Sequence, residues 1–159
     1  MKRLFLGLIC SLFYFTATAQ APATLMPGFK FYTQNNAGFT KADIPSGRQS
    51  LIVFFDGTCG HCQSTMTQLS KRSKELAQVN IYLISLDEFR TMNYFVDRYG
   101  KPFLSMKNVK LLHDKDRIFI PLFKPLKYPS IYLYSADKRL KIYSSDEQDI
   151  PNIISLVKK

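Results

Sequence analysis

Two cysteines that follow a run of apolar residues constrain the fold of this chain more than any other feature. Residues 51–55, Leu-Ile-Val-Phe-Phe, are typical of a buried strand, and a short polar turn comes directly after them. Beyond Cys59 and Cys62 the apolar residues recur at helical spacing as far as Ala77. The sequence therefore predicts a strand, a turn and a helix that begins at the cysteines and runs to about Ala77.

The positions of the two cysteines on this helix predict different roles for them. Cys62 falls on the apolar stripe with Met66 and Leu69, whereas Cys59 lies at the exposed start of the helix. The helix dipole and the unpaired backbone N–H groups at that start favour a thiolate. We therefore expect Cys59 to be the accessible nucleophile and Cys62 to be the half-buried resolving thiol of a redox pair.

The N-terminus has the pattern of a secretory signal peptide. Lys2 and Arg3 precede the apolar residues 4–15, and small residues at 17–19 offer a cleavage site after Ala19. The apolar run is shorter than the roughly 20 residues of a membrane-spanning helix. We expect an exported protein, in the periplasm or elsewhere outside the cytoplasm, with no stable membrane anchor after cleavage. The expected parts are a signal peptide, 1–19, a linker, 20–27, and one domain, 28–159.

Cysteine usage favours redox chemistry over a structural or metal-binding role. Cys10 lies in the signal segment, so the exported domain would keep two of the three cysteines. A bridge between them closes too small a loop to add much chain-entropy stability. A zinc site would need more ligands than His61 and His113 provide. No metal and no cofactor beyond the cysteine pair is expected.

The charge of the chain does not indicate a nucleic-acid partner. There are 22 Lys and Arg against 12 Asp and Glu, a net charge of +10. The positive residues are scattered, and no nucleic-acid motif with interleaved aromatic residues accompanies them. We interpret them as a solvated basic surface. We also expect the protein to be a monomer.

Strand and helix patterns alternate along the rest of the chain. The expected elements are, in order, a hairpin at 29–40, an apolar strand at 81–86, a helix with its stripe at 89–99 capped by Asp87, a strand at 109–112, an ambiguous segment at 118–123, a second hairpin at 131–143 and a final helix from Ile150. This order predicts α/β layers around a mixed sheet.

The motif Cys59-Gly60-His61-Cys62 at a strand-to-helix junction resembles the thioredoxin superfamily. Pro129, directly before a predicted strand, falls where that superfamily carries a cis-proline, and the whole chain is most similar to its exported TlpA/ResA-like thiol-disulfide oxidoreductases. The resemblance implies a thioredoxin-like three-layer α/β/α sandwich with an N-terminal hairpin extension and an inserted strand–helix–strand unit. It also implies that Tyr128 and Pro129 line the groove that holds an extended client segment beside Cys59.

Three positions depart from the patterns of these families. Val53 stands where thioredoxins carry a buried Asp, and Thr65 stands where ResA-like reductases carry a Glu. Both changes remove an acid that would help to deprotonate the resolving thiol, which leaves Asp56 as the candidate base. Thr58 replaces the usual Trp at the substrate groove.

The dipeptide Gly60-His61 between the cysteines matches that of protein disulfide isomerase, and we expect it to tune the redox pair. A partly protonated His61 close to Cys59 would stabilise the thiolate and hence the reduced form. Stabilising the reduced form makes the disulfide a better oxidant, so we expect a couple more oxidising than that of thioredoxin.

The sequence thus predicts an exported oxidoreductase that exchanges disulfides with protein clients and is turned over by a separate membrane or periplasmic redox partner. The direction of electron flow stays open. One alternative is a periplasmic copper-binding or copper-delivery protein that uses the same cysteines with His61 or His113. Another is a binding module whose cysteines stay oxidised. A peroxiredoxin is not favoured, because Asp56 stands where that family carries a Thr, three residues before the cysteine.

Overall fold

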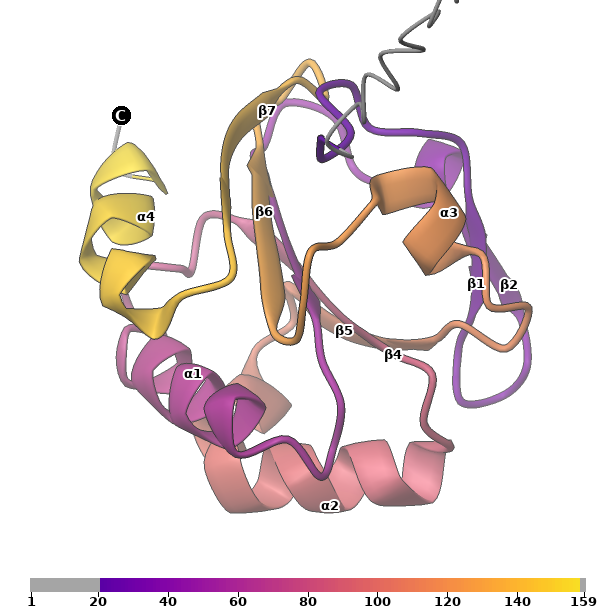
Figure 1. Cartoon of the computed structure of the whole chain (residues 1–159), viewed down its shortest axis with the longest axis vertical. Helices are drawn as coiled ribbons and strands as arrows, with labels where there is room; N and C mark the ends of the chain where they lie inside the picture. Colours follow the sequence, from indigo (N-terminus) through magenta and orange to yellow (C-terminus); the bar gives the residue numbers. More distant parts are fainter. Residues whose placement is uncertain (1–20, 158–159) are drawn as a thin grey trace, which may run out of the picture.

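The computed structural model describes residues 21–157, so the expected signal peptide, 1–19, lies outside the described residues. Seven strands form one sheet in the order β2-β1-β5-β4-β3-β6-β7 (Figure 1). The strands are β1 (Lys30–Tyr32), β2 (Gly38–Thr40), β3 (Ser50–Phe54), β4 (Asn80–Ser85), β5 (Val109–His113), β6 (Ser130–Tyr134) and β7 (Leu140–Ser144). The helices are α1 (Gly60–Lys71), α2 (Phe89–Tyr99), α3 (Phe119–Phe123) and α4 (Ile150–Val157), with short 3₁₀ helices η1 (Lys41–Asp43), η2 (Lys101–Ser105) and η3 (Glu147–Asp149).

The sheet is mixed, as predicted. β3 pairs in parallel with β4 and antiparallel with β6, and β4 pairs in parallel with β5. The unit β4–α2–β5 is the expected strand–helix–strand between the cysteine helix and Pro129. The N-terminal hairpin of β1 and β2 joins the sheet through the pairing of Tyr32 with His113.

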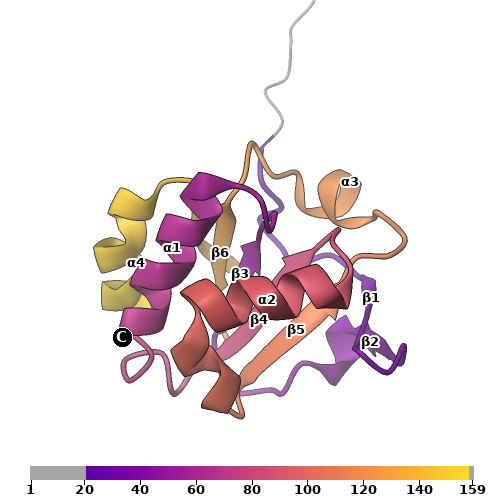
Figure 2. The same ribbon diagram turned by 90° about the horizontal axis from the view of Figure 1, so that it is seen from below.

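Alternating strand residues divide the interior into two hydrophobic cores. On β3, Leu51 and Val53 belong to the core under α1, α2 and α4, whereas Ile52 and Phe54 belong to the core under α3 and the N-terminal hairpin. Figures 1 and 2 show α1, α2 and α4 on one face of the sheet and α3 on the other. Because both faces of β3 are covered, its residues form the continuous apolar run seen in the sequence.

Aromatic rings fill the core on the α3 face. The ring of Phe119 stacks on those of Phe54 and Phe123, with centroids 4.1 and 4.3 Å apart. The ambiguous segment around Pro121 is a single short helix, α3. The buried carboxylate of Asp114 stabilises the start of this helix, because it accepts hydrogen bonds from the Ile118 and Phe119 N–H groups, each at 2.9 Å.

The cysteine helix is shorter than predicted. α1 ends at Lys71, where the Arg72 N–H bonds the carbonyls of Leu69 and Ser70, and the chain continues in turns. Bonds of this short type tighten the last turn of a helix. Leu76 is fully buried all the same. The apolar pattern therefore predicted burial correctly, and only the hydrogen-bonding pattern differs.

The N-terminal described residues lie against the domain. The N–H groups of Ala23 and Met26 donate to the carbonyls of Phe123 and Lys138, and the Met26 side chain is buried. The part of the expected linker that the structure describes is therefore in contact with α3 and with the turn between β6 and β7. Across residues 21–157, we find no helix with the length and apolar character needed to span a bilayer.

Candidate active site

The two cysteines follow the carboxyl end of the interior strand β3. Cys59 is the N-cap of α1, and its own N–H donates to the Asp56 carbonyl at 3.2 Å. Cys59 is partly exposed, whereas Cys62 is 1% exposed and packs in the core with Val53 and Phe55. The structure thus brings both thiols to the start of one helix, with one accessible and one buried.

Burial sets the acid–base behaviour of Cys62. It raises the pKa of this thiol strongly, and the nearby Cys59 thiol and Asp56 carboxylate act in the same direction. The Asp56 N–H, 3.5 Å from the Cys62 Sγ, opposes them. Cys62 is therefore a thiol at neutral pH, and its ionisation is a costly step.

Asp56 and Thr58 shape the turn that leads into the helix. Oδ1 of Asp56 accepts hydrogen bonds from the Thr58 N–H at 2.7 Å and from its hydroxyl at 2.6 Å. An aspartate that bonds the backbone two residues on forms an Asx turn. One oxygen of the candidate base therefore holds the turn, while the backbone of the same residue faces Cys62.

Asp87 supports this turn from the neighbouring strand instead of capping α2 as predicted. Its Oδ2 accepts from the Gly57 N–H at 2.8 Å and from the Ser85 hydroxyl at 3.1 Å. The N-cap of α2 is Glu88, which makes no side-chain capping bond. A Cβ on Gly57 would lie 2.8 Å from Cγ2 of Thr91, so glycine fits this close approach. The sequence carries a signal for this contact, because Gly57 and Asp87 each come shortly after a predicted strand. The two strands are parallel, so their carboxyl ends meet at the same end of the sheet.

The loop before β6 brings Tyr128 and Pro129 to the same end of the sheet. The Tyr128–Pro129 peptide bond is cis, as the resemblance implied. Burial raises the pKa of Tyr128 to about 12, with the charges of Asp56 and Asp87 acting in the same direction. The phenol therefore stays protonated at neutral pH, so that it can donate a hydrogen bond. The loop itself is anchored by Ser130, whose hydroxyl donates to the Lys127 carbonyl at 2.6 Å.

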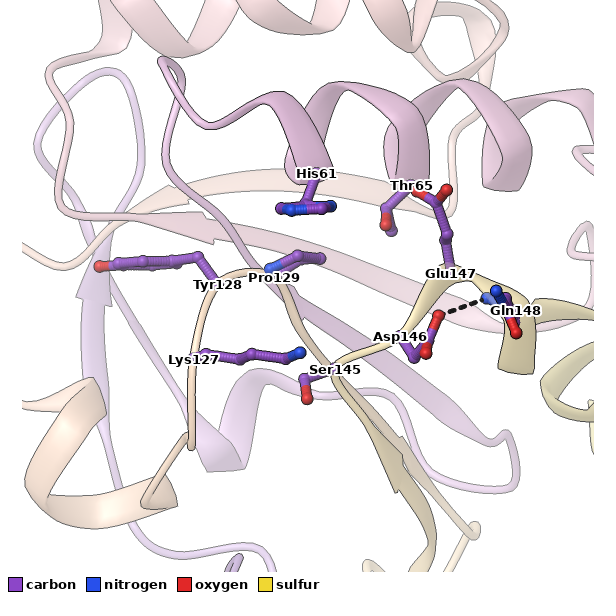
Figure 3. Close-up of a pocket in the computed structure, with 9 residues that line it drawn as sticks. All are labelled: His61, Thr65, Lys127, Tyr128, Pro129, Ser145, Asp146, Glu147 and Gln148. Atoms are coloured by element: carbon purple, nitrogen blue, oxygen red, sulfur yellow. Dashed lines mark hydrogen bonds between the residues drawn. The ribbon is translucent and has the colours of Figure 1, made fainter.

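A groove of about 320 Å³ runs between α1 and this loop (Figure 3). Figure 3 shows His61 on α1 above Pro129, with Tyr128 beside it. The sequence predicted Tyr128 and Pro129 at the groove and His61 beside the cysteines, whereas Thr58, also predicted at the groove, is not among its lining residues. The far wall, which the segment between β7 and α4 supplies, was not predicted. The remaining lining residues are Thr65, Lys127, Ser145, Asp146, Glu147 and Gln148.

The described residues offer little to a metal ion. Within 21–157, no group of three or more His, Cys, Asp and Glu side chains is placed to hold one. His113 lies on β5, separated from β3 by β4, and its ring contacts Phe89 edge-on at 6.0 Å. The structure therefore does not bring His113 together with the cysteines.

An accessible cysteine at a helix start, a buried partner behind it and a cis-proline across a groove, all on a mixed sheet, define a thioredoxin-like protein. The chain belongs to the AhpC/TSA family, whose family model matches residues 20–142. No curated protein matches the sequence.

Solved structures share the fold at low sequence identity. A secreted Mycobacterium tuberculosis disulfide oxidoreductase homologous to E. coli DsbE is 20% identical, with a TM-score of 0.64 over 80% of this chain and 95% of that one. A Bacteroides fragilis thiol-disulfide oxidoreductase is 16% identical, with a TM-score of 0.67 over 84% and 98%. BsSco, of the Sco family of cytochrome c oxidase assembly proteins, is 20% identical, with a TM-score of 0.67 over 88% and 95%.

Proposed function

We propose that this protein is an exported, TlpA/ResA-like thiol-disulfide oxidoreductase that exchanges disulfides with protein clients through Cys59 and Cys62. The observation that carries the proposal is the partly exposed Cys59 with Cys62 buried behind it, next to the cis-proline groove. Such a groove accepts an extended segment, whose backbone can hydrogen-bond the edge formed by the loop before β6.

The exchange conserves atoms and electrons in two displacements. The Cys59 thiolate attacks one sulfur of a client disulfide, forms a mixed disulfide and releases a client thiolate, which takes up a proton. Cys62 then loses its proton and attacks the Cys59 Sγ. The Cys59–Cys62 disulfide forms, and the second client thiolate leaves. The client gains the two electrons that the cysteine pair loses, and the reverse sequence oxidises a client. A separate redox partner restores the pair.

Export is the second part of the proposal. The N-terminal pattern of residues 1–19 supports it, and a structural neighbour is described as secreted. A cysteine pair of this kind is compatible with the periplasm, where disulfides form and persist.

Exchange with a small disulfide peptide, followed with dithiothreitol as the electron source, tests the proposed activity. Cys59→Ala should abolish turnover, and reduced Cys62→Ala, incubated with the peptide in the absence of dithiothreitol, should accumulate a mixed disulfide at Cys59 that mass spectrometry detects. Ser155→Ala, on the exposed face of α4, is the control and should leave the rate unchanged. Turnover that persists in Cys59→Ala would refute the proposal.

Copper binding by the same cysteines is the alternative to be separated from this activity. Within the described residues, only His61 lies near the cysteine pair as a further nitrogen ligand. Competition for Cu(I) between the reduced protein and a colourimetric chelator measures the affinity. Tight binding that Cys62→Ser removes, in a protein without exchange activity, would favour the copper function.

A further inference from the structure

Two buried polar atoms in the groove lack hydrogen-bond partners among the described residues. One is the hydroxyl of Thr65, a residue that is 1% exposed, and the other is Oε2 of Glu147. Both residues line the groove beside Pro129. Buried polar groups are normally satisfied, so an unpartnered pair facing one groove indicates a ligand that supplies the missing hydrogen bonds.

The two carboxylates next to Glu147 already accept hydrogen bonds from their own loop. Oδ1 of Asp146 accepts from the Gln148 N–H at 2.9 Å, the bond drawn in Figure 3, and Oδ2 of Asp149 accepts from the Ser144 hydroxyl at 2.6 Å. These bonds fix η3, which packs against α1. Figure 3 shows the Glu147 side chain extending from η3 toward α1, next to Thr65. These bonds hold the loop that carries Glu147 beside the groove.

No cation within residues 21–157 forms an ion pair with Glu147. The two ion pairs of this region are Arg72 with Glu75 and Arg139 with Asp137. Lys127 lines the opposite wall, where Figure 3 shows it extending toward Ser145. In a chain with a net charge of +10, the wall that carries Asp146 and Glu147 is a local negative site.

The distance from Cys59 fixes where a client would meet this site. A helix rises about 1.5 Å per residue, so Thr65 lies roughly 9 Å along α1 from Cys59. An extended peptide covers that length in about three residues. We propose that Thr65 and Glu147 form a subsite for the Lys or Arg side chain of a client, about three residues from its reactive cysteine. This inference rests on the proposed function, because it assumes that the client cysteine meets Cys59.

Matched peptides test the subsite without requiring any chemistry. Each carries Ser in place of the reactive cysteine and either Lys or the neutral norleucine three residues before or after it. Titration of the ¹⁵N-labelled protein, with the amide signals of Thr65 and Glu147 as reporters, gives the dissociation constant. Since a charge-assisted hydrogen bond is a strong one, the Lys peptide of the better register should bind about tenfold more tightly than its norleucine match.

Variants assign the preference to Glu147. Glu147→Gln should reduce the ratio to within about twofold, and Glu147→Lys should favour a matched Glu peptide, since the sign of the charge is reversed. Asp97→Asn removes an exposed negative charge from α2 and should keep the wild-type ratio. Equal binding of the Lys and norleucine peptides, unshifted signals of Thr65 and Glu147, or a preference that survives in Glu147→Gln would each overturn the subsite.

Versions of these peptides that keep the reactive cysteine, prepared as disulfides, separate this inference from the proposed function. Exchange at equal rates with both peptides means an oxidoreductase without the subsite. Charge-dependent binding without exchange means that the subsite serves a binding module and that the proposed activity is wrong.

Discussion

At the scale of single residues, we predict that Cys62 controls how fast a mixed disulfide is resolved. Its pKa is raised by burial, so its thiolate is a minor species at neutral pH, and each unit of added pH increases the thiolate tenfold. We predict that the resolution rate rises about tenfold per pH unit between roughly pH 6 and 8.5, with no plateau. The glutathione mixed disulfide, formed at pH 5 and jumped to higher pH, gives the rate by quenched mass spectrometry.

The same experiment on Asp56→Asn asks whether the carboxylate takes part. A carboxylate acting as the base would make the variant slower at every pH. A carboxylate that only shapes the turn and repels the Cys62 thiolate would make it equally fast or faster. A wild-type rate that levels off near pH 7 would contradict the raised pKa of Cys62.

His61 is expected to set the redox balance of the pair. It lies on the first turn of α1 and lines the groove. Loss of an imidazole that stabilises negative charge on Cys59 would destabilise the reduced form. We predict that His61→Ala makes the reduction potential more negative by about 20–30 mV, which corresponds to roughly 1 kcal/mol. Equilibration against glutathione measures it, with Gln68→Ala farther along α1 as the control. An unchanged or less negative potential would show that His61 does not tune the pair.

Residue roles could be predicted from the sequence wherever the chemistry is local. The positions of Cys59 and Cys62 follow from helical spacing: Cys59 is partly exposed, as expected, and Cys62, expected to be half-buried, is 1% exposed. In the sequence, Thr65 stands out only because it replaces the Glu of ResA-like reductases. Its neighbour Glu147 comes from a loop far along the chain, and no local pattern indicates that contact.

At the scale of elements, hydrophobic periodicity predicted the strands and helices well and predicted side-chain anchors poorly. The buried strands β3, β4 and β6 and the helix α2 lie where the apolar runs place them. Asp87 was expected to cap α2 because it precedes the helix. Tertiary structure placed it elsewhere: the parallel strands β3 and β4 bring Asp87 to the Gly57 N–H, from which it accepts a hydrogen bond.

This anchor predicts a measurable stability difference. Asp87→Ala leaves the Gly57 N–H and the Ser85 hydroxyl without their acceptor, which should lower the free energy of unfolding by about 2 kcal/mol. Asp87→Asn keeps an acceptor oxygen and should cost less than about 1 kcal/mol. Urea unfolding of the reduced proteins compares them, with Asp97→Ala as the exposed control. Equal losses in Asp87→Ala and Asp87→Asn would mean that charge, and not the hydrogen bonds, accounts for the effect.

At the scale of the whole molecule, the order of elements was enough to predict a mixed sheet between helical layers. Alternation of strand and helix requires parallel neighbours, while the closing hairpin requires antiparallel ones. The sequence did not predict that the segment between β7 and α4 would complete the groove. That placement depends on how α4 packs beside α1, since both share the core under one face of the sheet.

The last prediction concerns the cellular location of the protein and the cleavage of its signal peptide. Expressed from its first residue in a Gram-negative host, the chain should appear in the periplasm with Gln20 at its N-terminus, because Ala17 and Ala19 are the small residues that a signal peptidase selects. Ala19→Lys should block cleavage and hold the precursor at the membrane, whereas a form that starts at Gln20 should stay in the cytoplasm. Intact mass and osmotic-shock fractionation distinguish these products. Accumulation of the uncleaved wild-type chain at the membrane would mean that residues 1–19 act as an anchor, and Cys59 would then meet only clients within reach of that surface.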